Sequence, residues 1–270
     1  MVTTTATVIR PPAVAGLFYP ADRGELSHTL AALLDAAAEP ARRPPKAIIA
    51  PHAGYMYSGP VAASAYALIK PLRDRIRRVV LLGPAHRVAL RGLAVPAARA
   101  FRTPLGDLRI DADALAALRD LPQVVVSDRA HADEHSLEVH LPFLQTVLGD
   151  FGLLPLVVGD ATPEEVAQVI ERLWGGEETL IVVSSDLSHY HRYAEAQRLD
   201  LETAGAIAGL HADLDPEQAC GACPVNGLNL VAQRRSLQPV RLDLRNSGDT
   251  AGDRSRVVGY AAFAYHERQH

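Results

Sequence analysis

The sequence predicts an α/β fold in which helices flank a largely parallel or mixed central sheet. Short runs rich in Val, Ile and Leu recur along the chain, each bounded by Pro, Gly or Asp, which is typical of buried strands. These expected strands cover residues 46–50, 78–82, 123–126, 153–158 and 179–183. Segments with apolar residues at helical spacing lie between them. Because strands alternate with helices, the centre of the sheet is expected to be parallel.

The expected helices share a repeat of Leu, Ala or Val every three or four residues. They cover residues 24–37, 59–70, 112–119, 136–148, 163–173, 193–210 and 225–234. The end of the chain departs from the alternation, since residues 239–244 and 256–266 are predicted to be strands joined by the turn-rich segment 246–253. No internal repeat or long linker divides the sequence, so we expect a single domain over residues 1–270.

Composition excludes several classes of protein. Hydrophobic residues make up 48% of the 270 residues and charged residues 21%, which excludes wholesale disorder. A net charge of −4 argues against nucleic acid or an anionic membrane as a partner. No apolar run approaches the roughly 18 residues that span a bilayer. The segment Met1–Ala6 has no basic stretch leading into an apolar core, so we expect a cytoplasmic protein.

Polar side chains follow three of the expected strands at the point where each strand ends. His52 and His86 come after the first and second runs, and Asp186 and His189 after the run 179–183. Because the carboxyl ends of parallel strands form the ligand crevice of an open α/β sheet, we expect these side chains to share one site. The alternative for each histidine is that it caps a loop by hydrogen bonding.

His52, His86 and Cys220 together are a candidate metal-binding set. Imidazole and thiolate ligands suit iron, copper or zinc, and three protein ligands leave positions open for water, oxygen or substrate. Cys220 and Cys223 form a Cys-Gly-Ala-Cys motif before a helical run, so a redox dithiol stays open as an alternative.

Asp186 and His189 are a candidate acid–base pair. A carboxylate fixes the tautomer of a neighbouring imidazole and raises its basicity, which makes the imidazole a proton donor and acceptor near neutral pH. The alternative is that Asp186 caps a helix after the strand. The sequence has no Gly-x-Ser-x-Gly, phosphate-binding Gly loop or Gly-x-Gly-x-x-Gly, so hydrolase and nucleotide-binding functions lack support.

The segment 128–142 packs three histidines and four acids into 15 residues. If a helix begins near Ser136, that residue is its N-cap and Glu138 enters the first turn. Two interpretations follow. The segment is either a well-capped surface helix or a set of residues that bind substrate or support the site.

Several motifs, taken in order along nearly the whole chain, resemble those of the Memo family, whose bacterial and archaeal members are called AmmeMemoRadiSam system protein B. The motifs lie at residues 10–20, 50–55, 82–86, 133–142, 184–186 and 220–221. The resemblance implies the fold of the class III extradiol dioxygenases, which are non-haem iron enzymes. It also implies that His52, His86 and Cys220 match the metal-binding positions of the family.

The resemblance extends the candidate site beyond the metal ligands. The dioxygenases use two histidines and a carboxylate, whereas this chain has a thiolate in the third position. Asp186 and His189 are expected to be catalytic. The residues expected to contact substrate or support the ligands are Tyr55, His135, Glu138 and His140.

We therefore expect a protein that binds a divalent metal, Fe(II), with copper and zinc as alternatives. Its expected activity is a redox or dioxygenase-like reaction on a small, aromatic substrate, in which His189 moves protons and Asp186 orients it. The alternatives are a non-catalytic metal-binding or adaptor protein and a dithiol oxidoreductase using Cys220 and Cys223. The family name implies a pathway link to a radical SAM enzyme and an Amme-type protein.

Overall fold

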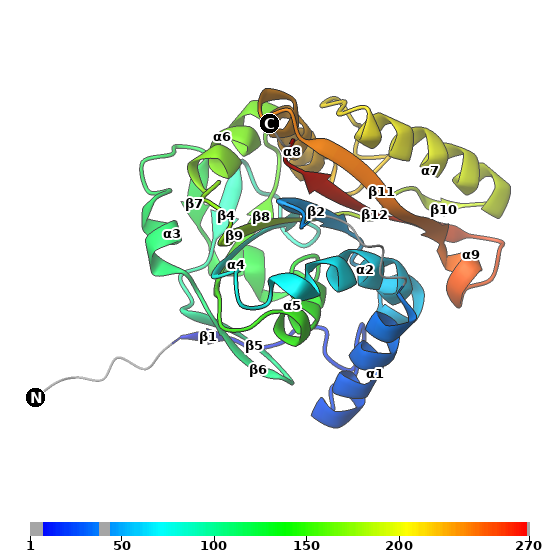
Figure 1. The fold of residues 1–270 in the computed structure, drawn as a ribbon, viewed down its shortest axis with the longest axis horizontal. Coiled ribbons are helices and arrows are strands. Elements are labelled where there is room, and N and C mark those ends of the chain that lie inside the picture. The colour runs from blue at the N-terminus through cyan, green and yellow to red at the C-terminus, as the bar shows by residue number, and fades with distance from the viewer. Residues whose placement is uncertain (1–7, 38–43, 269–270) are drawn as a thin grey trace, which may run out of the picture.

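The computed structural model describes residues 8–37 and 44–268, so the expectation drawn from Met1–Ala6 lies outside the described residues. The predicted α/β fold is confirmed, with a mixed central sheet between layers of helices (Figure 1). Within the described residues, the strands of this sheet are β2 (Ala47–Ala50), β3 (Arg78–Pro84), β4 (Leu93–Val95), β7 (Val124–Val126), β8 (Gly152–Val158), β9 (Thr179–Ser184), β10 (His189–His191), β11 (Gln238–Asn246) and β12 (Val257–His266). Their order is β10-β12-β2-β9-β3-β8-β4-β7, and β11 pairs with β12.

The four strands at the centre of the sheet are parallel, antiparallel pairs flank them, and the edge pair β4–β7 is parallel again. Strands β2, β9, β3 and β8 are parallel neighbours. The pairs β12–β2, β4–β8, β10–β12 and β11–β12 are antiparallel. The four central strands are buried on both faces, which is why they appear in the sequence as continuous apolar runs. The carboxyl ends of β2, β9 and β3 therefore meet side by side at one edge.

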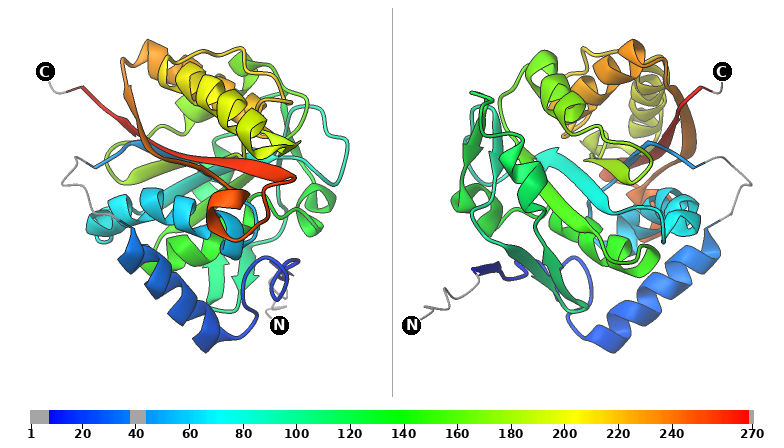
Figure 2. Two further views of the ribbon diagram at one scale, coloured as in Figure 1. Left: turned by 90° about the vertical axis from the view of Figure 1, so that its right-hand side faces the viewer. Right: turned by 60° about the vertical axis from the view of Figure 1, so that its left-hand side comes forward.

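Helices cover both faces of the sheet (Figures 1 and 2). One layer contains α1 (Arg23–Ala36), α2 (Tyr55–Ile69) and α5 (Leu141–Val147), and the other contains α3 (Ala112–Ala116), α6 (Pro163–Arg172), α7 (Tyr193–Ala208) and α8 (Ala222–Arg234). Successive strand residues alternate between the two layers, so that Ile48 packs with the first cluster and Ile49 with the second. None of the described helices is long and apolar enough to cross a membrane.

Several short elements are absent from the sequence prediction. They are β4, β10, the small sheet of β1 (Ile9–Arg10), β5 (Ala100–Thr103) and β6 (Gly106–Arg109), and the helices α4 (Asp128–Ala132) and α9 (Ser247–Thr250). Each has five residues or fewer, too few to show an apolar period.

The helix predicted over 136–148 begins later than expected. A 3-10 turn covers Glu138–His140, and α5 begins at Leu141. The prediction that Ser136 is the N-cap is wrong, because its hydroxyl donates to the carbonyl of Pro84, 2.8 Å away. The interpretation as a surface helix is also wrong, since residues 136–144 contain mostly buried side chains.

Candidate metal centre

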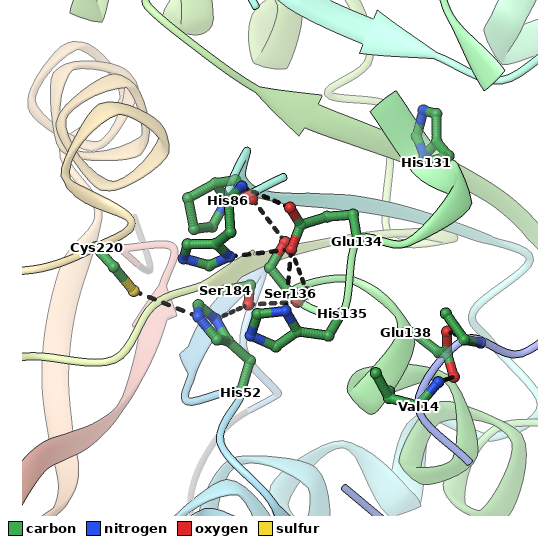
Figure 3. A network of polar contacts seen from close by, with 12 residues as sticks. Val14, His52, His86, His131, Glu134, His135, Ser136, Glu138, Ser184 and Cys220 are labelled. Carbon is green, nitrogen blue, oxygen red and sulfur yellow. Dashed lines mark hydrogen bonds and ion pairs between the residues drawn. The ribbon is translucent and has the colours of Figure 1, made fainter. Parts of the chain in front are cut away.

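The structure brings His52, His86 and Cys220 together at the carboxyl edge of the sheet. One potential ligand atom from each lies within 4.8 Å of the others (Figure 3). His52 and His86 each follow the end of a central strand by two residues, and β9 lies between those strands. Cys220 comes two residues before α8, and its Sγ lies 3.3 Å from His52 Nε2. Segments far apart in the sequence thus deliver two imidazoles and a thiol to one point.

Glycine at position 221 allows Cys220 to approach the end of β9. A Cβ atom on Gly221 would lie 2.4 Å from the carbonyl oxygen of Ser184 and 2.6 Å from Cβ of Ser185, which no side chain tolerates. The Gly221 amide donates to Ser185 Oγ at 3.0 Å, and the Asp186 amide donates to the Cys220 sulfur at 3.3 Å. Close packing and these two hydrogen bonds fix the position of the thiol.

Ser184 determines which ring nitrogen of His52 is free. Its Oγ lies 2.6 Å from His52 Nδ1, 2.7 Å from His140 Nε2 and 2.6 Å from the carbonyl oxygen of Ser136. The carbonyl only accepts, so it takes the single hydroxyl proton, and both imidazoles must donate to Ser184. His52 therefore carries its proton on Nδ1 and leaves Nε2, the nitrogen that faces the thiol, with a free lone pair. His140 accepts from the hydroxyl of Tyr66 at its other nitrogen, at 2.7 Å.

Glu134 binds Nδ1 of His86, as Ser184 binds Nδ1 of His52. Its Oε1 lies 3.0 Å from His86 Nδ1, and its Oε2 accepts from the His86 amide at 2.6 Å. Burial alone would raise the pKa of Glu134, but these hydrogen bonds and one from the Ser136 amide together lower it to about 2. The ionised carboxylate accepts from Nδ1–H, so Nε2 is the nitrogen of His86 that can face a metal. Carboxylate–histidine pairs of this kind orient imidazole ligands in metal sites.

The electrostatics of the cluster favour neutral ligands before a metal binds. Burial, and then the neighbouring histidines, lower the pKa of His52 far below its usual range. Burial and the nearby Asp186 raise the pKa of Cys220. A metal ion requires neutral imidazole and thiolate, so its binding would release the thiol proton. Burial raises the pKa of Asp186 itself to about 7.

Two imidazoles that present Nε2 and one thiol fit a soft or borderline ion such as iron, zinc or copper. A second group, His86, Glu134 and His135, also has ligand atoms within 4.8 Å of one another. However, both Glu134 oxygens already accept hydrogen bonds from His86. Together with the Ser136 amide, these bonds occupy most of the lone pairs of Glu134 and hold it against His86, so the set containing Cys220 is the better metal site. Nδ1 of His135 is buried and lies 3.4 Å from Glu134 Oε1, within ion-pair distance but without hydrogen-bond geometry.

A cleft of about 440 Å³ opens beside this cluster. Of the predicted residues, Asp186, His189 and His135 line it. Asp186 Oδ1 accepts from the His52 amide at 2.8 Å, so this carboxylate contacts the segment of a predicted metal ligand as well as lining the cleft with His189. The alternative that Asp186 caps a helix is wrong, since the next element is strand β10. Aromatic side chains contribute much of the remaining wall: Phe18, Tyr57, Tyr190 and Tyr260.

The structure does not bring Tyr55, Glu138 or His140 to the cleft wall. Tyr55 is buried and its hydroxyl donates to the carbonyl of Val139 at 2.7 Å. His140 lies behind Ser184, where it supports His52 rather than a substrate. Glu138 is fully buried, and its oxygens accept from four groups in the N-terminal segment: the Arg10 guanidinium, the amides of Ala13 and Val14, and the Tyr19 hydroxyl.

Cys223 belongs to a different environment from Cys220. Both cysteines are free, and Cys223 packs against the apolar cluster between α8 and the sheet. Its sulfur is not part of either group of converging ligand atoms found among the described residues. This packing gives no support to a redox dithiol.

The sequence analysis did not identify three residues whose hydrogen bonds orient the histidines of the site: Ser184, Glu134 and Tyr66. Ser184 ends an apolar run and Tyr66 lies inside an apolar helix, so neither has a local signal. Glu134 lies in the segment rich in acids and histidines, which identified the region but not which acid faces His86.

The fold and the cluster define an α/β protein with a candidate mononuclear metal centre at the carboxyl edge of its sheet. Residues 10–264 match the family described as Memo-like protein. The chain belongs to the Memo family, as the sequence motifs predict.

The relatives of the chain agree with this assignment. The chain is 37% identical to a MEMO1 family protein of Aeropyrum pernix, over 94% of this chain and 98% of that protein. It is also 37% identical to a MEMO1 family protein of Aquifex aeolicus, over 95% and 99% of the two chains. In fold, the chain is similar to the crystal structure of uncharacterized protein JW3007 from Escherichia coli K12. That likeness has a TM-score of 0.50 and 14% identity, and covers 81% of this chain and 99% of that one.

Replacing Ser184 with alanine is expected to lower metal affinity by about 10- to 100-fold, the range observed when an outer hydrogen-bond partner of a ligand is lost. Without the hydroxyl, His52 and His140 lose their shared acceptor and the tautomer of His52 is no longer fixed. Competition with a chelator measures the affinity. Ser64→Ala is a matched control, because its hydroxyl lies on α2 and bonds Asp243 instead. Equal affinities of Ser184→Ala and the parent protein would contradict this role.

Proposed function

We propose that this protein binds one divalent metal ion through His52 Nε2, His86 Nε2 and Cys220 Sγ, and that it carries out a redox or dioxygenase-like reaction on a small aromatic substrate. The observation that carries the proposal is the convergence of these three donors beside a cleft with aromatic walls. Bound Fe(II) would bring the substrate and O₂ together and pass electrons from the aromatic ring, which is oxidised, to O₂, and copper or zinc would fit the same donors.

The residues of the cleft would position the substrate and move its protons. The aromatic walls would hold a ring and exclude water. Burial lowers the pKa of His189, which keeps its imidazole neutral and able to accept a phenolic proton. Asp186, with a pKa of about 7, is a second group that both accepts and donates a proton near neutral pH. The ring of His135 would form part of the wall against the substrate, while its buried Nδ1 lies 3.4 Å from Glu134 Oε1.

A non-catalytic metal-binding protein is the second candidate. The observation that favours it is the thiol of Cys220, which stands where non-haem iron oxygenases have a carboxylate. Protein purified without oxygen and assayed for metal content, then for O₂ uptake with catechols, separates the two candidates. Oxygen uptake that depends on Fe(II) supports the enzyme. Stoichiometric metal without any O₂ uptake supports the second candidate.

Replacing His189 with alanine is expected to leave metal content unchanged and to lower turnover by about 10²- to 10⁴-fold, the usual contribution of a general acid–base group. His189 lines the cleft but is not among the converging ligand atoms. Metal analysis and O₂ uptake measure the two effects. Loss of metal would make His189 a ligand, and unchanged turnover would remove it from the mechanism.

A further inference from the structure

Strand β10 contains a bulge that turns two consecutive side chains toward the cleft. His189 pairs with Val258 and His191 with Val257, so Tyr190 is an extra residue with no partner across the strand pair. In a regular strand, His189 and Tyr190 would point to opposite faces. Here both line the cleft, and Tyr190 has a φ of 64°, a left-handed conformation that is unfavourable for a bulky side chain. The fold therefore keeps the exposed Tyr190 side chain at the mouth of the cleft, although a bulky residue disfavours this left-handed backbone conformation.

Tyr190 holds a guanidinium at that mouth. The Cζ atom of Arg256 lies 5.0 Å from the centre of the Tyr190 ring, and Arg256 also lines the cleft. Arg192 and Arg254 lie around the adjoining hollow, which Tyr190 and Arg256 share. Among the described residues, none of these three arginines has a carboxylate within ion-pair distance. The rim of the cleft thus carries positive charge that the chain itself does not neutralise.

The acid nearest to Arg256 in sequence, Asp253, is hydrogen-bonded within its own turn. Asp253 also lines the cleft, and its Oδ1 accepts from the Ser255 amide at 2.7 Å. The other acid of the lining, Asp186, is bonded to the His52 amide beside the metal ligands. The guanidinium of Arg256 is therefore left free to bind a group that enters from solvent.

We propose that Arg256, held over the ring of Tyr190, binds the carboxylate of an aromatic acid whose ring occupies the cleft. A guanidinium presents paired N–H donors that match the two oxygens of a carboxylate. The walls are aromatic, and a cleft of about 440 Å³ holds a ligand of one ring with small substituents. Arg256 is the one arginine among the residues that line the cleft, and one guanidinium neutralises a single negative charge, which favours a carboxylate over a doubly charged phosphate. The inference rests on the proposed function for the place of the ring and adds the class of substrate.

The test compares two probes that differ by one carboxylate: catechol and 3,4-dihydroxybenzoate. Their binding to the full chain loaded with Zn(II), which does not support redox turnover, is measured by titration calorimetry. A charge-assisted hydrogen-bonded pair predicts that the parent protein binds the acid about 10-fold more tightly than catechol or better. Arg256→Gln should bring the two affinities to within about 3-fold of each other while leaving the affinity for catechol unchanged. That unchanged affinity shows that the variant is folded.

Arg192→Gln is the matched control, because Arg192 lies on the rim but does not line the cleft. It should keep most of the preference for the acid, which separates direct contact from a general effect of positive charge. Equal binding of both probes by the parent protein, or an intact preference in Arg256→Gln, would overturn the inference and leave the proposed function standing. Failure of both probes to bind would overturn the inference together with the proposed aromatic substrate.

Discussion

Cys220→Ser is expected to lower metal affinity by more than about 100-fold, which exceeds the usual effect of losing only an outer partner of a ligand. Serine supplies a hydroxyl that is a poor ligand for iron, copper or zinc, whereas the thiolate is the soft donor of the set. The fold should persist, because the hydroxyl still accepts the hydrogen bond that the Asp186 amide gives to the sulfur. Metal analysis of protein prepared without oxygen measures the loss, and circular dichroism checks the fold.

Cys223→Ser is the matched control for this experiment. Cys223 lies three residues away on α8 and packs against the apolar cluster, so its replacement should keep the metal. A greater loss of metal in Cys223→Ser than in Cys220→Ser would contradict the assignment of ligands. Loss of folded protein in Cys220→Ser alone would indicate that the metal has a structural role.

Glu138→Gln is expected to destabilise the protein by about 3–5 kcal/mol, the usual result of removing one partner of a buried ion pair. The Arg10 guanidinium would remain buried without its counter-charge, since Arg10 is only 6% exposed and Glu138 is fully buried. The amides and the tyrosine hydroxyl that Glu138 accepts from would also lose an ionised acceptor. Urea unfolding measures the change in the free energy of unfolding.

The exposed pair on α7 supplies the control. Glu202→Gln removes a partner of Arg198 where both side chains are 60% exposed, so no resolvable change in stability is expected. Folded Glu138→Gln protein should bind metal as the parent does, because Glu138 ties the N-terminal segment to the core and does not reach the cleft. A variant with normal stability and lost metal would instead make Glu138 part of the site.

The central strands could be predicted from the sequence because both of their faces are buried. A run such as 153–158 must then be apolar throughout, and its short length and its flanking glycines distinguish it from a buried helix. The strands of the small sheet gave no such signal, since β1 has two residues and its pairing with β5 is set by the tertiary fold. The start of α5 was misplaced because Ser136 resembles an N-cap, whereas its hydroxyl donates to the carbonyl of Pro84 at the end of β3.

The strand ends also explain how much of the candidate site the sequence reveals. His52 and His86 follow parallel strands, and topology alone brings such positions to one edge of the sheet. The partners that orient them, Ser184 and Glu134, act through hydrogen bonds between distant segments, which no local pattern encodes. Glu138 was expected at the cleft because it lies in the same motif as His135. His135 does line the cleft, whereas Glu138 is buried against the N-terminal segment.

X-ray absorption spectroscopy of the Zn(II)-loaded protein tests the metal site most directly. The site of His52, His86 and Cys220 predicts a sulfur neighbour at about 2.3 Å and nitrogen neighbours at about 2.0–2.1 Å. The sulfur contribution should disappear in Cys220→Ser and persist in Cys223→Ser. A metal surrounded by nitrogen and oxygen alone in the parent protein would contradict the assignment and would point instead to the group of His86, Glu134 and His135.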